Sequence, residues 1–258
     1  MTTSAKPLTV GIVVAMRQEF DAIRQVVMPD APVEVHQYSQ VAAARESGVG
    51  YVIIQSGVGT TNAAIGTCDL LHCYRPHWVL NLGTAALISD PDSSLSVADV
   101  LVGEHHCQWD LDLGGPITPE WGGKRSFVDV LQTNCLYPDA GLLQGALALS
   151  EPGNFRLAPA HFFTGNSFFV SDAQHNVLPA TAAPVAVDME SFAVAQVCAR
   201  KQVPFLCIRG ITDTGTASAN QDFYANVRAA SRAAATVAQK LVQLLLPKEE
   251  QANAEIQH

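Results

Sequence analysis

Two acidic residues of this 258-residue chain stand where a reaction could use them. Glu190 ends the sequence Val-Asp-Met-Glu at the start of a helix-like run, Ser191 to Arg200, and Asp213 follows an apolar, strand-like run, Val203 to Ile211. In an α/β sheet, helix starts and the carboxyl ends of strands meet at the crevice where ligands bind. Carboxylates at such a crevice can bind sugar hydroxyls and transfer a proton.

Each acid also has an ordinary structural interpretation. Glu190 at a helix start can complement the helix dipole as a cap. Asp213, which precedes Thr214-Gly215-Thr216, can simply begin a turn. A third acid, Glu19, lies one turn into a helix-like run, Gln18 to Val27, where a solvated helix face would explain it. None of the three acids identifies a site by itself.

Composition limits the classes of protein to consider. The chain is 48% hydrophobic and 15% charged, which predicts a packed core, and its net charge of −9 with no Lys/Arg block argues against docking to nucleic acid or an anionic membrane. Arg17 and Glu19 interrupt the first apolar run, which excludes a signal peptide or membrane span there. The six cysteines include no CxxC pair and several lie in apolar runs, so we expect buried, reduced thiols and a cytoplasmic protein.

The elements that must position these acids alternate along the chain. Apolar runs predict strands at 8–15, 51–55, 78–82, 97–103, 161–164, 184–187 and 203–211. Helical patterns follow at 18–27, after residue 60, at 142–149 on an exposed edge, from residue 189, and at 224–246. The alternation predicts one α/β domain over residues 1–258 with a largely parallel sheet, a core of about 8–246 and a polar tail, 247–258.

Other motifs exclude common cofactor and metal sites. Ser56-Gly57-Val58-Gly59 and Leu82-Gly83-Thr84 are small-residue turns that let backbone approach a ligand, but neither is a GxGxxG or GxxxxGK[ST] motif. The residues His105, His106, Asp110 and Asp112 match no standard zinc spacing, and no cysteine was expected to assist them. We therefore expect neither a metal nor a cofactor.

Seven short segments, in order, resemble the nucleoside phosphorylase/nucleosidase superfamily, and most closely its bacterial 5′-methylthioadenosine/S-adenosylhomocysteine nucleosidases. They are Gly11-Ile-Val-Val-Ala-Met-Arg-Gln-Glu19, Ser56-Gly-Val-Gly59 with Asn62-Ala-Ala64, Asn81-Leu-Gly-Thr-Ala85, Val97-Ala-Asp-Val100, Gly165-Asn-Ser-Phe168, Val187-Asp-Met-Glu190 and Arg209-Gly-Ile-Thr-Asp213. The resemblance runs from about residue 8 to residue 246. It implies a single-domain, three-layer α/β/α sandwich around a mixed, partly closed central sheet, and a homodimer.

The resemblance also implies residue roles in cleaving the N-glycosidic bond of a purine nucleoside. Asp213 would protonate or hydrogen-bond the departing base, and Glu19 would orient and deprotonate the attacking water. The residues expected to bind substrate are Glu190 on the ribose hydroxyls, Met189 under the sugar, Phe168 and Phe169 at the base, Thr84 on the ribose and water side, and Asp188 beside them. Because the bond breaks through an oxocarbenium-like sugar, charges around the ribose and a proton for the base are the main requirements.

One position separates hydrolysis from phosphorolysis. In the hexameric phosphorylases of this superfamily an Arg grips phosphate two residues before the Gly of the third-strand turn, and here that residue is Asn81. A phosphate dianion without a guanidinium partner would bind poorly, so water is the expected nucleophile. The alternatives are phosphorolytic cleavage, a futalosine-type hydrolase, and a nucleoside-binding protein without catalysis.

Three substitutions depart from the nucleosidase pattern. Asn166 stands where an Asp is usual, Asp188 replaces a frequent Glu, and Ala86 replaces a Gly. Asn166 removes a charge near the expected base pocket and so bears on adenine specificity. Phe223 is a candidate for closing the 5′ side, where an apolar pocket would favour methylthio or deoxy substituents over phosphate.

Overall fold

A computed structural model describes residues 8–36, 39–111, 128, 130–149 and 154–246. The strands are β1 (Thr9–Val14), β2 (Val33–Val35), β3 (Gln40–Glu46), β4 (Val49–Gln55), β5 (Trp78–Ser89), β6 (Val100–Gln108), β7 (Cys135–Leu136), β8 (Leu157–Thr164), β9 (Val185–Asp188) and β10 (Phe205–Asp213). The helices are α1 (Arg17–Val27), α2 (Thr60–Tyr74), α3 (Ala140–Leu147), α4 (Asp172–His175), α5 (Ser191–Lys201) and α6 (Ala219–Leu245).

The strands form one mixed sheet that closes on itself at one end. Its order is β10-β6-β8-β9-β5-β1-β4-β3-β2, and β10 pairs with β5 as well as with β6. The second pairing joins β10, β6, β8, β9 and β5 in a ring, while β1, β4, β3 and β2 extend from β5 as an open sheet. The strands β4, β1, β5 and β10 run parallel to their neighbours in that order, which brings their carboxyl ends to one edge.

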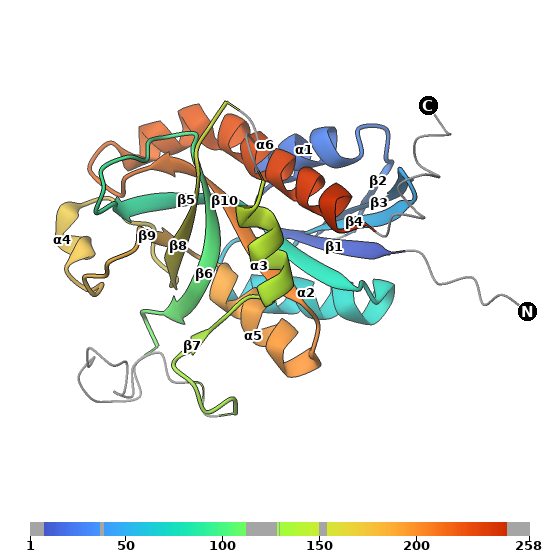
Figure 1. The fold of residues 1–258 in the computed structure, drawn as a ribbon, viewed down its shortest axis with the longest axis horizontal. Helices are drawn as coiled ribbons and strands as arrows, with labels where there is room; N and C mark the ends of the chain where they lie inside the picture. The colour runs from blue at the N-terminus through green and yellow to red at the C-terminus, as the bar shows by residue number, and fades with distance from the viewer. Residues whose placement is uncertain (1–7, 37–38, 112–127, 129, 150–153, 247–258) are drawn as a thin grey trace, which may run out of the picture.

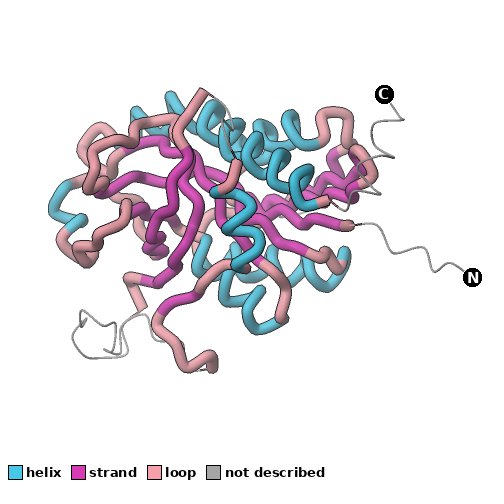
Figure 2. The backbone as a smooth tube through the Cα atoms, viewed as in Figure 1, coloured by secondary structure: helices cyan, strands magenta, loops and turns pink. Residues whose placement is uncertain are grey.

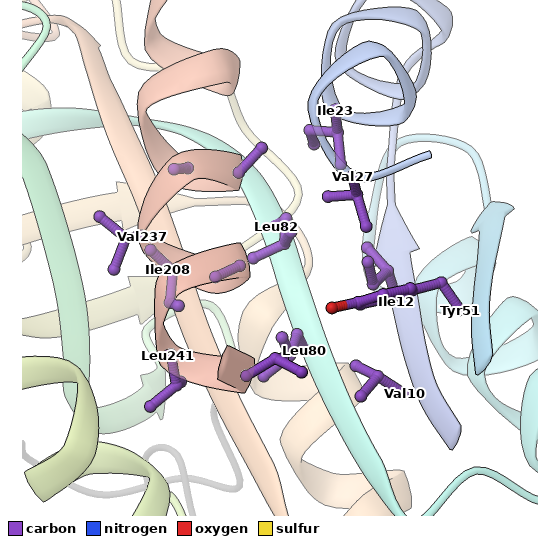
Figure 3. Packing of buried hydrophobic residues seen from close by; sticks show 14 of the residues in the cluster. Val10, Ile12, Ile23, Val27, Tyr51, Leu80, Leu82, Ile208, Val237 and Leu241 are labelled. Carbon is purple, nitrogen blue, oxygen red and sulfur yellow. The ribbon is translucent and has the colours of Figure 1, made fainter. Parts of the chain in front are cut away.

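Helices cover both faces of the sheet, as Figures 1 and 2 show, with α1, α3 and α6 on one side and α2 and α5 on the other. The apolar stripes of α1 and α6 pack on the strands through residues such as Ile23, Val27, Val237 and Leu241 (Figure 3). Each such side chain contributes roughly 1.5–3 kcal/mol when it leaves water. The three-layer α/β/α sandwich with a mixed, partly closed sheet expected from the sequence is confirmed.

The observed elements differ from the expected ones mainly at their ends and at the sheet edge. Strand β5 extends beyond the expected residue 82 to Ser89. Helix α6 begins at Ala219, before the expected residue 224, because the first residues of α6 are too small and polar to show an apolar stripe. The edge strand β2 and its neighbour β3 were not predicted: all three residues of β2 are exposed, and in β3 only Val41 and Ala42 are buried. Helix α3 does not lie on an exposed edge: Leu142 and Ala146 are buried in the main core.

The expectation of reduced thiols is wrong for two of the six cysteines. Cys107 on β6 and Cys135 on β7 form a disulfide, because antiparallel pairing places them directly opposite each other. Cys198 and Cys207 are buried thiols, whereas Cys68 and Cys73 are exposed on α2. In the part of the chain that the structure describes, no helix is both long enough and apolar enough to cross a membrane.

Candidate active site

A cavity of about 360 Å³ lies at the edge where the carboxyl ends of the parallel strands meet. All eight residues selected from the sequence line it: Glu19, Thr84, Phe168, Phe169, Asp188, Met189, Glu190 and Asp213. They come from the middle of β5, the ends of β9 and β10, the segment after β8, and the starts of α1 and α5. The most distant two, Glu19 and Asp213, are 194 positions apart in the chain. Asp112 and the glycine pairs at 114–115 and 122–123 lie outside the described residues.

Glu19 is buried, with 2% of its surface exposed, so it is not part of a solvated helix face. Its Oε2 accepts hydrogen bonds from the backbone N–H groups of Ala15 (3.2 Å) and Met16 (3.0 Å), which caps the start of α1. Its Oε1 accepts from the N–H and the hydroxyl of Thr84, both at 3.0 Å. Four donors therefore fix this carboxylate between the end of β1 and the middle of β5.

Gly83 makes this arrangement possible. Its φ of +153° is one that L side chains rarely adopt, and a Cβ there would lie 2.6 Å from Glu19 Oε1 and 3.0 Å from Arg209 Nη1. The absence of a side chain lets the carboxylate and the guanidinium approach the β5 backbone. The small-residue turn seen in the sequence thus serves close packing of charged groups rather than a phosphate loop.

Glu190 occupies the N-cap position of α5, but its side chain does not cap that helix. Instead Oε1 accepts a hydrogen bond from the N–H of Gly59 (3.0 Å), at the start of α2, and Oε2 lies 3.4 Å from Arg209 Nη2. Burial is the main cause that raises the pKa of Glu190 to about 7, with smaller contributions from Asp188 and Glu19, while Arg209 opposes the shift. A carboxyl with that pKa changes its charge near neutral pH.

Arg209 is a buried cation, 1% exposed, in the middle of β10. Its Nη2 lies 3.1 Å from Asp188 Oδ2 and donates to Asn81 Oδ1 at 2.7 Å, and its Nη1 donates to the carbonyl oxygen of Thr84 at 3.1 Å. Together with Glu190, these acceptors engage the guanidinium from within the protein. Asn81 is thus an acceptor for Arg209 and not a binding group that faces the cavity.

Asp188 lines the cavity, but both of its oxygens are engaged by the protein. Oδ2 faces Arg209, and Oδ1 accepts the hydroxyl hydrogen of Thr164 at 2.6 Å. The Thr164 oxygen then lies 3.0 Å from the Ser191 hydroxyl, which lies 3.1 Å from Nδ1 of His106. Burial lowers the pKa of His106 to about 3, so the ring is neutral. His106, Ser191 and Thr164 thus form a continuous series of polar contacts that ends at Asp188.

Asp213 ends β10 and is 1% exposed. Its Oδ1 accepts from the N–H of Gly215 (2.9 Å) and its Oδ2 from the hydroxyl of Thr212 (2.8 Å), so it does begin a turn, as its ordinary interpretation predicts. Burial nevertheless raises the pKa of Asp213, and these two hydrogen bonds only partly offset that shift. An acid with a raised pKa at a cavity wall can donate a proton.

Aromatic rings form the outer wall of the cavity. The ring of Phe168, which is 37% exposed, meets Phe223 edge to face with centroids 5.8 Å apart, and Phe223 meets Tyr224 at 5.5 Å. Phe169 is buried behind them, edge to face with Trp109 at 5.4 Å. Flat apolar walls of this kind suit a purine ring.

Asn166, which stands where an Asp is usual, is not among the residues that line the cavity. Its Oδ1 accepts from the N–H (3.0 Å) and the hydroxyl (3.1 Å) of Thr60, and its N–H and Nδ2 bond Asp110 Oδ2 at 2.8 and 3.2 Å. It therefore joins the start of α2 to the segment after β8. Any effect of Asn166 on the base site is transmitted through the placement of these segments.

Several residues that line the cavity had no role predicted from the sequence, among them Met16, Arg209, Asn220 and Tyr224. Arg209 offered a usable signal, because an arginine inside an otherwise apolar strand must find buried partners. Met16 lies between β1 and α1, Asn220 and Tyr224 lie in the first turns of α6, and nothing in their residue types indicates a ligand.

The partly closed α/β/α sandwich and its acid-lined cavity are features of one class of protein, and comparison with known proteins identifies that class. The chain belongs to the phosphorylase superfamily, whose sequence profile matches residues 9–246. Among curated proteins, it is similar to the 5′-methylthioadenosine/S-adenosylhomocysteine nucleosidase of Listeria welshimeri, with 29% identity over 236 residues that cover 89% of this chain and 96% of the relative.

Solved structures agree with this placement. The 5′-methylthioadenosine/S-adenosylhomocysteine nucleosidase of Colwellia psychrerythraea, solved in complex with adenine, superimposes with a TM-score of 0.78 at 25% identity, covering 93% of this chain and 96% of that one. The futalosine hydrolase of Helicobacter pylori shares the fold at 21% identity, with a TM-score of 0.81 and coverage of 92% and 98%.

Proposed function

We propose that this protein hydrolyses the N-glycosidic bond of a purine nucleoside and releases the free base. The first candidates for substrate are 5′-methylthioadenosine and S-adenosylhomocysteine, because the nucleosidases similar to this chain over 89% of its length carry these names. The cavity supports the proposal through its buried acids and aromatic wall.

The internal hydrogen bonds and ion pairs of Arg209 favour hydrolysis over phosphorolysis. It is the sole cationic side chain among the described residues that line the cavity, and four internal acceptors already engage it. Glu19, Asp188 and Glu190 surround it with carboxylates. A phosphate dianion would meet repulsion there without a free guanidinium, whereas a neutral water molecule would not.

Asp213 would supply the proton to the departing base. Its raised pKa favours the protonated form, and the fixed bonds from Gly215 and Thr212 hold the carboxyl in one orientation. Phe168 would stack on the base, and the backbone of Phe169 would bind the base edge. Protonation makes the base a better leaving group, so the C–N bond breaks at a lower barrier.

Glu190 would bind the ribose hydroxyls and stabilise the positive charge that develops on the sugar. Because Gly59 and Arg209 hold its two oxygens from behind, the carboxylate is positioned before substrate arrives. Met189 would pack under the sugar. Asp188, whose oxygens are engaged by protein donors, would act through Arg209 as a positioning residue.

Glu19 would orient the nucleophilic water and accept its proton. Its four acceptor positions are filled in this structure, but one donor, the Thr84 hydroxyl, can rotate away while the backbone donors cannot. Water that takes the place of this hydroxyl would lie against both Glu19 and Thr84. The sugar would then leave as the free pentose derivative.

The apolar side of the cavity supports a neutral 5′ substituent. Met16, Val58 and Phe223 line it, and no described cationic side chain other than Arg209 is available for a 5′-phosphate. A methylthio group would gain from contact with these side chains, whereas a phosphate would lose its water without a partner.

Release of free base in phosphate-free buffer tests the proposed function. We expect adenine from 5′-methylthioadenosine and S-adenosylhomocysteine, with adenosine, inosine and futalosine as comparison substrates. Absence of base release from every one of these nucleosides would contradict the proposal and favour a binding protein. Faster release from futalosine than from either adenosine derivative would overturn the choice of substrate.

The assembly and the location of the protein are further proposals. We propose a homodimer, which the family resemblance implies and which the exposed apolar side chains Val58 and Ile65 at the start of α2 support. Light scattering after gel filtration is expected to give twice the mass of the 27.5 kDa chain, and a mass of one chain would contradict it. The cytoplasmic location stays a prediction that cell fractionation would test.

A further inference from the structure

Away from the reaction chemistry, three neighbouring strands bring metal-binding side chains together. His105 and Cys107 lie two residues apart on β6 and therefore on the same face. Cys135 on β7 is paired with Cys107, and His161 on β8 is paired with His105. Figure 1 shows β6 with β8 and β7 beside it. This cluster differs from the His105, His106, Asp110 and Asp112 group considered in the sequence, because it depends on the pairing of β7 with β6.

The distances among these side chains suit a small metal site. One ligand atom from each of His105, Cys107 and Cys135 lies within 4.8 Å of the others. Cys107 Sγ is 3.9 Å from Nε2 and 4.0 Å from Nδ1 of His105. In a tetrahedral zinc site with bonds of about 2.0–2.3 Å, neighbouring ligand atoms lie roughly 3.5 Å apart. Small side-chain rotations would therefore be enough once the two sulfurs separate.

The surroundings favour binding of a cation by neutral imidazole. The rings of His105 and His161 have centroids 4.8 Å apart, so two imidazoles face the same side of the sheet as the two sulfurs. Neutral imidazole and thiolate are the ligands that thiophilic divalent ions such as Zn²⁺ select. Two sulfurs and one or two nitrogens make a set that hard ions such as Mg²⁺ and Ca²⁺ avoid.

We propose that Cys107, Cys135 and His105 form a binding site for a zinc-class divalent cation when the disulfide is reduced, with a fourth position for water or His161. A dithiol reductant gives two electrons and two protons to the disulfide and becomes a cyclic disulfide itself. The two cysteine thiols then release their protons as their sulfurs bind the cation. The disulfide seen here and the metal complex are mutually exclusive states of one site.

The location connects this site to the cavity. Cys107 and Cys135 belong to the same apolar cluster as Phe169 and Val187, both of which line the cavity. The site is nevertheless built from residues that have no role in the proposed hydrolysis, so its test does not depend on that proposal.

Metal binding by the reduced and oxidised forms of one polypeptide tests the proposal. The full chain carrying Cys68→Ser and Cys73→Ser is used, because these two exposed thiols would bind metal on their own. After reduction and removal of the reductant without air, equilibrium dialysis against Zn²⁺ is expected to retain about one ion per chain. Co²⁺ in its place is expected to show thiolate-to-cobalt absorption. The oxidised form of the same protein is expected to bind neither.

Substitutions of the proposed ligands test whether these side chains bind the ion. Cys135→Ser and His105→Ala are each expected to weaken Zn²⁺ binding at least 10-fold, while Cys198→Ser, a buried thiol elsewhere, leaves it unchanged. Equal binding by the reduced and oxidised proteins would overturn the proposal, and this comparison needs no substitution in the site. So would a Zn²⁺ affinity that stays the same in both Cys135→Ser and His105→Ala.

Discussion

At the scale of single residues, each acid of the cavity is held by donors that suit a different task. Glu19 has four donors, Glu190 has a backbone N–H and a guanidinium, and Asp213 has a backbone N–H and a hydroxyl. Only Glu190 has a cationic partner among these bonds. Asp213 has none, and burial raises its pKa. We therefore assign the proton transfer to Asp213 and the contact with the sugar to Glu190.

Asp213→Asn keeps the shape of this side chain and removes its proton. We expect kcat for base release to fall about 100- to 10,000-fold, with a small change in KM, since the proton is needed only as the bond breaks. Asp69→Asn, an exposed carboxylate on α2, is the matched control and is expected to behave like the natural protein. Steady-state kinetics measures both, and unchanged kcat in Asp213→Asn would remove this residue from the mechanism.

The pKa of Glu190 predicts the acidic side of the pH profile. Glu190 binds ribose hydroxyls as an acceptor and so must be ionised, and its pKa of about 7 means that kcat/KM is expected to fall as pH drops below about 7. Asp188 is one of the charges that raise this pKa, so Asp188→Asn is expected to move the acidic limb to lower pH. An acidic limb that does not move would show that another group causes it.

The raised pKa of Glu190 also determines how this residue makes the stability of the fold depend on pH. The folded pKa of Glu190 lies above its ordinary value of 4.5, so between about 4.5 and 7 the unfolded chain gives up a proton that the folded chain keeps. The contribution of Glu190 to the free energy of unfolding therefore falls as pH rises through that window and is constant above it. Urea unfolding with Glu190→Gln, which cannot titrate, is expected to lack this dependence.

At the scale of elements, the close approach of α6 to β10 positions Asp213 and the aromatic wall together. A Cβ on Gly210 would collide with the backbone of Ala230 in α6. Helix α6 carries Phe223 and Tyr224 at its start, while β10 carries Arg209 and ends at Asp213. The distance between these two elements therefore sets the width of the cavity.

Gly210→Ala is expected to push α6 away from β10. We expect the free energy of unfolding to fall by about 1–3 kcal/mol, the usual cost of overpacking a core, together with an increase in KM. Gly141→Ala on the exposed first turn of α3 is the control, because Ala is the better helix former there. Urea titrations of both variants measure the difference, and equal stability would contradict the close packing described.

Contacts between elements that are far apart in the chain could not be predicted from the sequence. Apolar runs predicted the main strands, because that signal is local, and the family resemblance carried by seven short motifs implied the eight selected cavity residues. The partners of Arg209 are distant in sequence: Asn81 and Thr84 precede it by 128 and 125 positions. The Cys107–Cys135 pairing depends on β7, a strand of two residues that has no periodicity to detect.

At the scale of the whole molecule, the partly closed sheet holds four carboxylates and one guanidinium away from water. Such a group of charges is costly to bury, and its internal pairing accounts for how the fold tolerates it. We propose that this pairing also favours water as the nucleophile, because both Nη groups of Arg209 are already engaged within the protein. The central claim is thus that water, and not phosphate, completes the reaction.

The rate of adenine release from 5′-methylthioadenosine, measured as phosphate is raised from none to saturating concentrations, tests this claim most directly. We predict full activity without phosphate, no increase when it is added, and a free reducing sugar as the second product. A rate that depends on phosphate and yields a sugar 1-phosphate would contradict the account.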